Sequence, residues 1–527
     1  MMKENNIPKI PADKFRFVGD EVRLHDQKMD TKQVSYFRDA FNRFCKNKSS
    51  VTAAIIILLL VLYAVFVPMF CQTNYSLALT DTDYLMYGKM LPRNQLCVDL
   101  GLNFWDGFKN REGVTKPAYD QARAVAEETG LEVIKNAQQV GTNERGVAVY
   151  DFRINSYIYN GSDGAYTYMT LTEEQYLSIQ AWQKENSVQV IYPAVYDTKL
   201  PKMHAQNADI WYEANEKGAP LVDANNNFVP IYRQSKQVEM DDGYNSLRIE
   251  GDPGLENPNA ENRYRYASIT GDSSAISYKC RVLKYAYFQY KYGFEPSFLF
   301  GTTAMGQDML TRLASAAQFS LLLAICVSAI NLFIGAIYGA IEGYYGGAID
   351  MLMERFTDIL ARIPFMVVAT LFQLHLAKVV GPVVSLLFAF VLTGWIGMAS
   401  TTRMQFYRFK GQEYVLASRV LGASDWRIMF RHIFPNSLGT IVTSSVLVIP
   451  GVIFSESSLT YLGIVNLDSS TMTSVGTMLA NGKDYLSDYP HVIFFPAMFI
   501  SLLMISFNLF GNGLRDAFNP SLRGADD

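Results

Sequence analysis

A run of 20 residues without a charged side chain, Val51–Phe70, constrains the fold of this chain more than any other feature. A helix of that length can cross the hydrocarbon core of a bilayer, which is about 30 Å thick. Mean hydropathy is only +0.05 although 49% of the residues are hydrophobic, so apolar segments must be combined with a large polar portion. Five further apolar segments predict spans at 318–341, 356–376, 382–400, 437–455 and 491–511. Together with the first run they make six.

The distribution of Lys and Arg predicts the orientation of these spans. Residues 1–50 contain 11 Lys and Arg and residues 401–436 contain 6, whereas residues 456–490 contain only Lys483 beside four acidic residues. Basic residues favour the cytoplasmic side of a membrane. Both termini are therefore expected in the cytoplasm.

This topology divides the chain into five parts. The first is an arm with an apolar periodicity before the first span, which predicts an interfacial helix. The polar portion follows the first span as one extracellular insertion, and the remaining five spans form a core around the cytoplasmic segment 401–436. The predicted boundaries are 1–50 for the arm, 51–71 for the first span, 72–297 for the inserted domain, 298–511 for the core and 512–527 for a cytoplasmic tail.

The inserted domain carries the signals of an ordinary α+β domain. Thr172 and Gln175 are spaced as a capping box before an amphipathic helix. The runs Val147–Tyr150 and Val188–Tyr192 predict strands, and its length fits a domain with its own core. Tyrosines cluster toward its end, at 264–292. They predict either a surface that grips a peptide or partner, or cross-strand packing and anchoring at the membrane interface.

The cysteines outside the spans are compatible with either a disulfide or free thiols. Cys97 and Cys280 lie near the two ends of the inserted domain, on the side where oxidation is permitted. A disulfide between them would tie the base of the domain together. Unpaired thiols are the alternative, because sequence alone cannot test the geometry that a disulfide needs.

The segment 401–436 is long, basic and helix-forming. Leu416, Val420 and Leu421 fall at helical spacing, and Gly422 then permits a turn or a close backbone approach. This pattern predicts a short helix, a kink and a second helix that ends at Pro435. An amphipathic helix lying on the membrane is the alternative for such a segment taken alone.

The same segment resembles the cytoplasmic coupling loop, or EAA motif, of ABC importer permeases of the oligopeptide, dipeptide and nickel class. Two positions depart from the family pattern: Leu416 stands where the motif usually has glutamate, and Ser418 replaces its second alanine. The resemblance implies an ATPase-coupling loop formed by Leu416, Ala417, Ser418, Arg419, Leu421, Gly422, Ala423, Ser424, Asp425 and Pro435.

Other segments are similar to the C-type permease of peptide importers and occur in the family's order. They are Gly343–Asp350, Glu456–Gly463 and Phe507–Pro520. The resemblance covers about residues 30–71 and 296–523, and it implies the type I ABC importer permease fold, an all-α polytopic membrane protein. Glu456, placed just outside the fifth span, is the candidate for the translocation path, because ionisable residues near spans are functional candidates.

The resemblance also implies a division of labour. The chain has no G-x-x-x-x-G-K-[ST] phosphate loop, so we expect no cofactor in this chain, with ATP and Mg bound by partner subunits. It is expected to be a transport subunit and not an enzyme. The implied partners are a homologous second permease subunit, two cytosolic ATPase subunits, an extracellular substrate-binding lipoprotein and a peptide substrate, all at a bacterial plasma membrane.

Two alternatives remain at this point. One is a nickel or oligosaccharide ABC importer permease. The other is a membrane sensor with a ligand-binding ectodomain, which should carry a larger cytosolic output domain than residues 512–527. A metal site within the chain is not expected from five scattered histidines, and a net charge of −4 gives no support for nucleic-acid binding.

Overall fold

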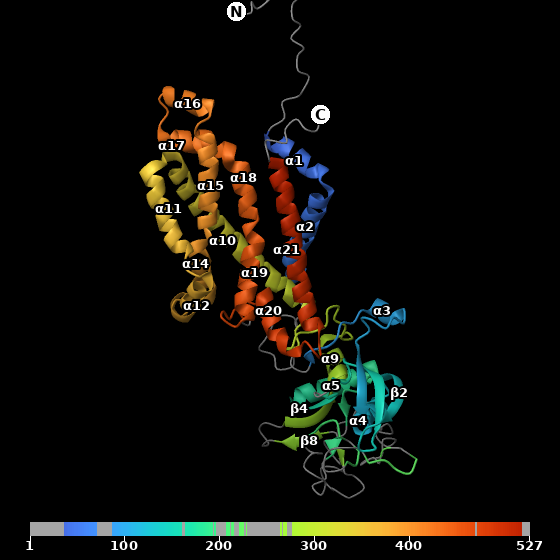
Figure 1. Cartoon of the computed structure of the whole chain (residues 1–527). Coiled ribbons are helices and arrows are strands. Elements are labelled where there is room, and N and C mark those ends of the chain that lie inside the picture. Colours follow the sequence, from blue (N-terminus) through green and yellow to red (C-terminus); the bar gives the residue numbers. More distant parts are fainter. Residues whose placement is uncertain are drawn as a thin grey trace, which may run out of the picture.

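The structure is a computed structural model in which a bundle of long helices carries a separate α+β domain at one end (Figure 1). The sequence parts 1–35 and 519–527, which belong to the predicted arm and tail, lie outside the described residues. The structure describes residues 36–70, 87–160, 164–192, 194–195, 207–210, 212–214, 221–225, 228, 264–265, 267–270, 277–468 and 472–518.

Among the described residues, five helical segments are long and apolar enough to cross a membrane, or six if one bent pair is a single span. The bent pair is α11 (Gly347–Ala361) and α12 (Phe365–His375), which meet at 70°. Pro364 stands at the break and disfavours helical geometry in the residue before it. The five segments are α2 (Lys48–Phe70), α10 (Met309–Tyr345), α14 and α15 together (Pro382–Gly394 and Ile396–Phe409), Asp425–Tyr461 and α21 (His491–Phe518).

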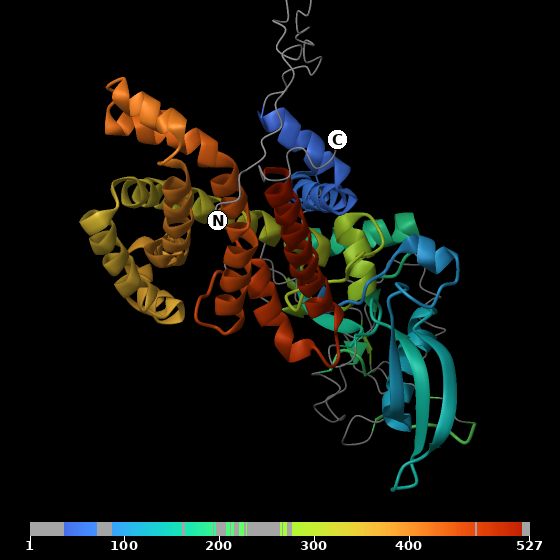
Figure 2. The ribbon, with the colours of Figure 1, turned by 45° about the horizontal axis from the view of Figure 1, so that its top comes forward.

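Helix α10 runs through the middle of the bundle and packs closely on α15. Gly335, Gly339 and Gly343 repeat every four residues along α10, and each faces the backbone or a Cβ atom of the other helix. Small residues at this spacing allow two membrane helices to approach closely. Helices α2 and α21 pack together at one edge of the bundle, and α11, α12 and α14 form the opposite edge (Figure 2).

A short amphipathic helix, α1 (Tyr36–Lys46), precedes α2 and packs against α21. The rings of Phe44 and Phe510 meet edge to face with centroids 5.4 Å apart. Arg43 and Asp39 form an ion pair of 2.7 Å along the same helix. This helix lies within the segment where the apolar periodicity of the arm predicts an interfacial helix.

The inserted domain is built from two main sheets, so the expectation of an α+β fold is confirmed. The first sheet has the order β1-β3-β2; in the second, β9 pairs with β4, β5 and β8. Its elements are α3 (Gln95–Asp99), β1 (Phe108–Thr115), α4 (Lys116–Thr129), β2 (Ile134–Thr142), β3 (Ala148–Asn155), β4 (Tyr166–Thr172), α5 (Glu173–Asn186), β5 (Ile191–Tyr192), β6 (Ala194–Val195), β7 (Tyr264–Arg265), β8 (Ala267–Thr270), β9 (Ser277–Leu283) and α9 (Lys284–Tyr292).

Local sequence signals in this domain are confirmed. Thr172 caps α5, and its backbone N–H donates to the Gln175 side chain in return, which completes the predicted capping box. Tyr278, Tyr285 and Tyr287 are buried in the hydrophobic core. These three tyrosines of the cluster therefore pack the domain and do not form a gripping surface.

The possible disulfide between Cys97 and Cys280 is not formed, because both cysteines are free thiols. Cys280 lies in the middle of β9, paired with Met169 of β4 on one side and Ala267 of β8 on the other. Burial raises the pKa of the Cys280 thiol, so it behaves as a small apolar core residue. Cys97 lies instead on α3, in a loop at the base of the domain.

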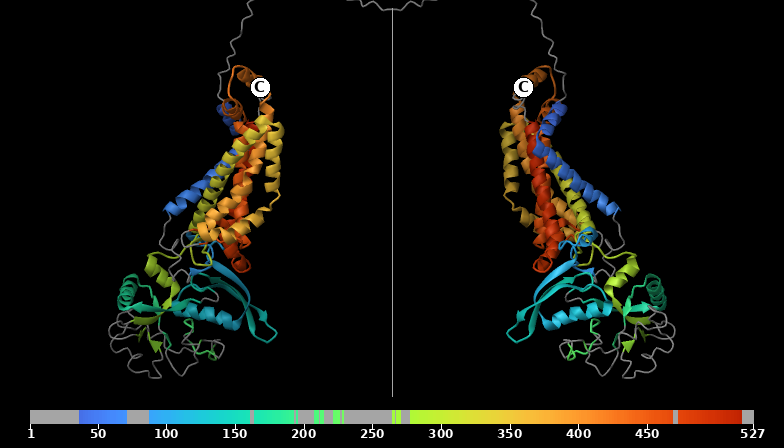
Figure 3. Two further views of the ribbon diagram at one scale, coloured as in Figure 1. Left: turned by 90° about the vertical axis from the view of Figure 1, so that its left-hand side faces the viewer. Right: turned by 90° about the vertical axis from the view of Figure 1, so that its right-hand side faces the viewer.

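The inserted domain lies against one end of the bundle (Figure 3), where backbone and side-chain contacts hold it. Three backbone hydrogen bonds join residues 89–93 to residues 298–303, which lead into α10, at 2.8–3.0 Å. The Tyr489 hydroxyl donates to Asn160, and the Lys109 ammonium lies 3.9 Å from the centroid of the Tyr489 ring. The domain is thus attached to the bundle both by backbone hydrogen bonds of residues 89–93 and by side chains on its surface.

Candidate functional site

The segment predicted to couple with an ATPase forms a helical hairpin at the end of the bundle farthest from the inserted domain (Figure 1). Its first helix, α16 (Glu413–Val420), ends in a Schellman motif. The Ala423 N–H donates to the Ser418 carbonyl and the Gly422 N–H donates to the Arg419 carbonyl, at 3.1 and 3.0 Å. Gly422 has φ of +78°, the left-handed conformation that such a turn requires.

The second arm of the hairpin does not end at Pro435, which corrects the sequence-based expectation. It starts at α17 (Asp425–Arg427), continues through a π-helical turn (Ile428–Ile433) and enters α18 (Phe434–Val446). Pro435 occupies the first turn of α18, directly after the π-helical turn. The hairpin therefore runs without interruption into α19 (Val448–Tyr461) and the membrane span.

Tyr344, at the end of α10, joins both arms of the hairpin. Its hydroxyl donates to Asp425 at 2.5 Å and accepts from Arg419 at 3.4 Å. Below this pair, Val415 of α16 and Ile428 of the π-helical turn are buried in one cluster with Ala340 and Phe406. The hairpin is consequently packed onto the ends of α10 and α15 as a rigid unit.

An ion-pair network lies next to the base of the hairpin. Arg403 of α15 binds Asp350 at 2.6 Å and Glu354 at 2.9 Å, both on α11, and lies 3.5 Å from Glu342 of α10. The Tyr407 hydroxyl also donates to Asp350, at 2.6 Å. Arg403 joins three helices at this end, because a guanidinium can bind several carboxylates at once.

Lys410 and Tyr414 follow the network on the way into the hairpin. The Lys410 ammonium donates to the Gly343 carbonyl at 2.9 Å, and burial lowers the pKa of this lysine while the Asp350 carboxylate opposes the shift. Burial raises the pKa of Tyr414, against a hydrogen bond with Asn436. Lys410 thus belongs to the half-buried base of the hairpin, while Tyr414 remains partly exposed.

The free end of the hairpin exposes large apolar side chains, which we name the apolar tip: Leu416, Val420, Leu421 and Trp426. Val420 and Leu421 are 87% and 86% exposed. The structure brings all the predicted coupling residues into this one hairpin. Those that are exposed beside the tip are Ala417, Arg419, Gly422, Ser424, Asp425 and Pro435, while Ser418 and Ala423 are half-buried.

Glu456 lies inside α19 and not just outside the span, which is a second correction. Its carboxylate is 1% exposed and accepts hydrogen bonds from Ser320 of α10 at 3.2 Å and from Ser457 and Thr460 of its own helix. In this structure it joins α10 to α19. Its place on a translocation path remains a prediction.

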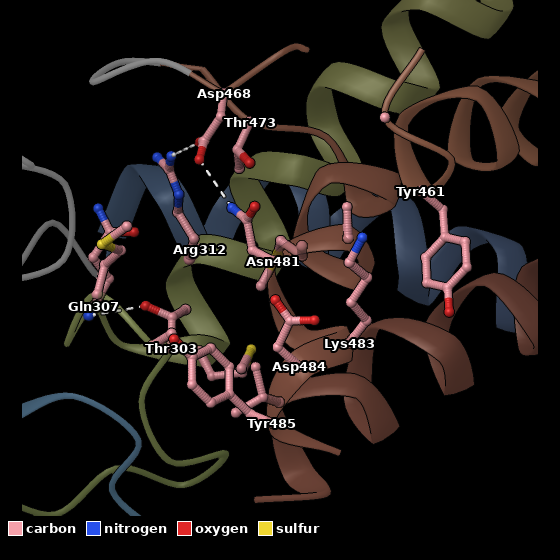
Figure 4. A pocket seen from close by; sticks show the side chains of 17 residues that line it. Thr303, Gln307, Arg312, Tyr461, Asp468, Thr473, Asn481, Lys483, Asp484 and Tyr485 are labelled. Atoms are coloured by element: carbon pink, nitrogen blue, oxygen red, sulfur yellow. Dashed lines mark hydrogen bonds and ion pairs between the residues drawn. The ribbon is translucent and has the colours of Figure 1, made fainter. Parts of the chain in front are cut away.

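A pocket of about 390 Å³, lined by apolar side chains and several charged and polar ones, opens at the opposite end of the bundle, between the start of α10 and the segment leading to α21 (Figure 4). Arg312 and Asp468 form an ion pair of 3.3 Å, and Asn481 donates to the same carboxylate at 2.9 Å. Lys483 and Asp484 also line it. Within the described residues, no group of three His, Cys, Asp or Glu could hold a metal ion.

Sequence reasoning found the hairpin but missed the residues that hold it. Tyr344 and Asp350 were part of a recognised segment without an assigned role, and Arg403 was not singled out. A signal was present for Arg403, because a cation near the end of an apolar span needs a partner. The sequence could not indicate which carboxylates provide it.

Two family descriptions match the chain. Residues 331–524 match the binding-protein-dependent transport system inner membrane component, and residues 35–92 match the N-terminal membrane domain of oligopeptide transport permease C. The chain is 40% identical to the oligopeptide transport system permease protein OppC of Bacillus subtilis, over 42% of this chain and 72% of that protein. It is 39% identical to the dipeptide transport system permease protein DppC of the same organism, over 42% of this chain and 69% of that protein.

A solved structure, the MetNI methionine ABC transporter in inward-facing conformations, aligns with 40% of this chain and 98% of its own, at 16% identity and a TM-score of 0.33. The family rests on the sequence matches, which cover the first span and most of the helical core together with the hairpin. The chain therefore belongs to the family of binding-protein-dependent transport system inner membrane components, the permease subunits of ABC importers.

Proposed function

We propose that this chain is a permease subunit that takes up oligopeptides and is driven through its hairpin by separate ATPase subunits. The observation that carries the proposal is the apolar tip: four large hydrophobic side chains exposed at the end of a rigid polar hairpin. Large apolar side chains gathered on an exposed surface mark sites of protein interaction, and Trp426 is of a type that often dominates the affinity of an interface. Two relatives are named as permease proteins of oligopeptide and dipeptide transport systems, which supports a peptide as the cargo.

The contacts of the hairpin suggest how force would reach the spans. Because the second arm continues into α18 and α19, a displacement of the tip moves that span directly. Tyr344 links the same movement to α10, and the Arg403 network links α10 and α15 to α11. ATP-driven closure of the ATPase subunits would then switch the bundle between outward and inward exposure. ATP and Mg would be bound by those subunits, with no cofactor in this chain.

The proposed complex contains a homologous second permease, two cytosolic ATPase subunits and an extracellular substrate-binding lipoprotein. The lipoprotein would deliver peptide at the end that carries the inserted domain and the pocket of Figure 4. Both charge signs line that pocket, which suits the two charged ends of a short peptide. The peptide path itself would lie between the two permeases.

The proposal predicts that Leu421→Asp weakens binding of the ATPase subunits. Burying a Leu side chain contributes about 1.5–3 kcal/mol, so its loss corresponds to a roughly ten- to hundredfold lower affinity. The measurement is the retention of ATPase subunits on the tagged permease across a dilution series. Leu177→Asp is the matched control, because Leu177 is 49% exposed on the inserted domain. Equal retention for both variants would contradict the role of the tip.

The orientation makes a separate prediction. In a background without native cysteines, a cysteine at Glu144 in the β2–β3 turn should react with a membrane-impermeant maleimide in intact cells. A cysteine at Asn436, which is exposed near the hairpin, should react only after lysis. The reverse pattern would show that both termini are outside the cytoplasm.

A further inference from the structure

A loop at the base of the inserted domain, residues 94–105, exposes an unusual amount of apolar surface. It contains α3 and only one charged residue, Asp99. Five of its side chains are large, hydrophobic and exposed: Leu96, Leu100, Leu102, Phe104 and Trp105, with Leu96 and Leu100 at 70% and 74%. An exposed apolar cluster of this size on a polar domain indicates an interaction site. We name this segment the apolar loop.

The apolar loop is closed and held in a fixed position. Arg93 and Asp106 form a β-bridge at its base, and the Asn94 N–H donates to the Trp105 carbonyl at 2.7 Å. Arg153 of β3 fastens the same base by binding Asp106 and the Asn103 side chain at 2.9 and 3.0 Å. The exposed side chains are therefore presented by an Ω-shaped loop with a rigid base.

The position of the loop is set by the membrane span that follows the domain. The Arg93 N–H donates to the Phe298 carbonyl at 2.8 Å, and residue 298 lies in the segment that leads into α10. In Figure 1, α3 lies at the height of α20 (Val475–Gly482), at the ends of the spans, and projects sideways from the bundle. This height corresponds to the interfacial region of the bilayer and not to the bulk solvent around the rest of the domain.

The composition of the loop fits lipid as its partner. Trp and Phe are enriched where membrane proteins cross the interface, and leucines on a short helix bury well between headgroups and acyl chains. Trp105 adopts φ of +52°, a conformation that is rare for a bulky residue and costs free energy. Within the described fold Leu96, Leu100 and Phe104 remain mostly exposed, while Leu102 and Trp105 are partly covered.

We propose that the apolar loop inserts into the membrane leaflet on the side of the inserted domain and fixes the domain against the bilayer. The expected depth is about 5–10 Å, at the boundary between headgroups and acyl chains. The domain would then have two attachments, one to the bundle through residues 89–93 and one to lipid. This proposal depends on the chain spanning a membrane, and it is independent of which substrate the chain transports.

The test uses the full-length chain in nanodiscs of phosphatidylcholine and phosphatidylglycerol. An environment-sensitive fluorophore is attached to a cysteine at Leu100 in a background without native cysteines, and lipids carry a spin label near the top of the acyl chain. We expect these lipids to quench the fluorophore, and aqueous iodide to have little effect. The matched control is the same fluorophore at Leu177, which should be quenched by iodide and not by the lipids.

A second measurement needs no attached fluorophore, so its result does not depend on whether the label disturbs the apolar loop. Brominated lipids should quench tryptophan emission less in Trp105→Phe than in the unmodified chain. The difference reports on Trp105 alone, because the other four tryptophans are common to both chains. Quenching of the Leu100 fluorophore by iodide alone would overturn the proposal. Protection from both iodide and spin-labelled lipid would overturn it as well, since protein would then cover the loop.

Discussion

Gly422→Val is expected to abolish substrate-stimulated ATP hydrolysis by the assembled complex without releasing the ATPase subunits. Gly422 has φ of +78°, and a Cβ atom there would meet nothing within 4 Å, so the substitution acts only through the backbone. A left-handed residue other than glycine costs about 1–2 kcal/mol, and a β-branched one is disfavoured further. The turn would relax to another conformation and break the two hydrogen bonds that end α16.

That relaxation displaces Leu421 from Trp426, so the two arms of the hairpin would no longer present one surface. ATP hydrolysis is measured in proteoliposomes with and without the binding protein and peptide, and subunit composition is measured by size-exclusion chromatography. Gly411→Val is the matched control, because Gly411 also has open space around it but does not require positive φ. Gly422→Asn should keep partial activity, since asparagine tolerates the left-handed region. Full activity of Gly422→Val would refute a coupling role for this turn.

Hydrophobicity predicted the spans well because their length is imposed by the bilayer and not by contacts within the protein. The structure confirms long apolar helices for five of the six predicted spans, whereas the predicted span 356–376 falls on the bent pair of α11 and α12. Boundaries also differ: α10 begins at Met309 and not at 318. Its additional first turns are capped by Asp308, and Met309 and Leu313 are buried in the core of the bundle with Val475, Met478 and Val492. A hydropathy pattern cannot include such turns, because they are stabilised by tertiary contacts.

The hairpin was predictable only in part, because tertiary contacts also decide its structure. A glycine after a helical periodicity indicates a turn, and Gly422 forms one. The continuation of the helix through Pro435 was missed, since a proline also fits the first turn of a new helix. The clamp between Tyr344 and Asp425 joins residues 81 positions apart, and that between Arg403 and Asp350 joins residues 53 apart. No local pattern encodes pairings of that separation.

Within the inserted domain, sequence patterns that involve only neighbouring residues again predicted the local structure correctly. The capping box needs only four consecutive residues, and it is present. The pairing of β4 with β9 joins Met169 to Cys280, which no local pattern indicates. The same pairing places Cys280 inside a sheet, and of the two alternatives that the sequence left open the structure has the free thiols.

Arg281→Met is expected to destabilise the inserted domain by about 3–5 kcal/mol, because it leaves a carboxylate buried without its partner. Arg281 of β9 and Glu128 of α4 form a bidentate pair at 2.6 and 2.8 Å, with side chains 1% and 0% exposed. Arg281 also donates to the Ala208 carbonyl and lies over the Tyr166 ring, 3.7 Å from its centroid. One guanidinium thus holds a helix, two strands and a loop together.

Hydrogen exchange of the β4 and β9 amides in the full-length chain measures this loss as a lower free energy of local opening. Lys279→Met is the matched control, because Lys279 is two residues away on β9 and half-buried, and its loss should cost no more than about 1 kcal/mol. The double variant Arg281→Met with Glu128→Leu should recover part of the stability, since the Glu128 carboxylate is then no longer buried without the arginine. A residual deficit of about 1–3 kcal/mol is expected from the Ala208 carbonyl, which loses its donor. A double variant as unstable as Arg281→Met alone would show that the packing of the arginine, and not its charge, holds the domain together.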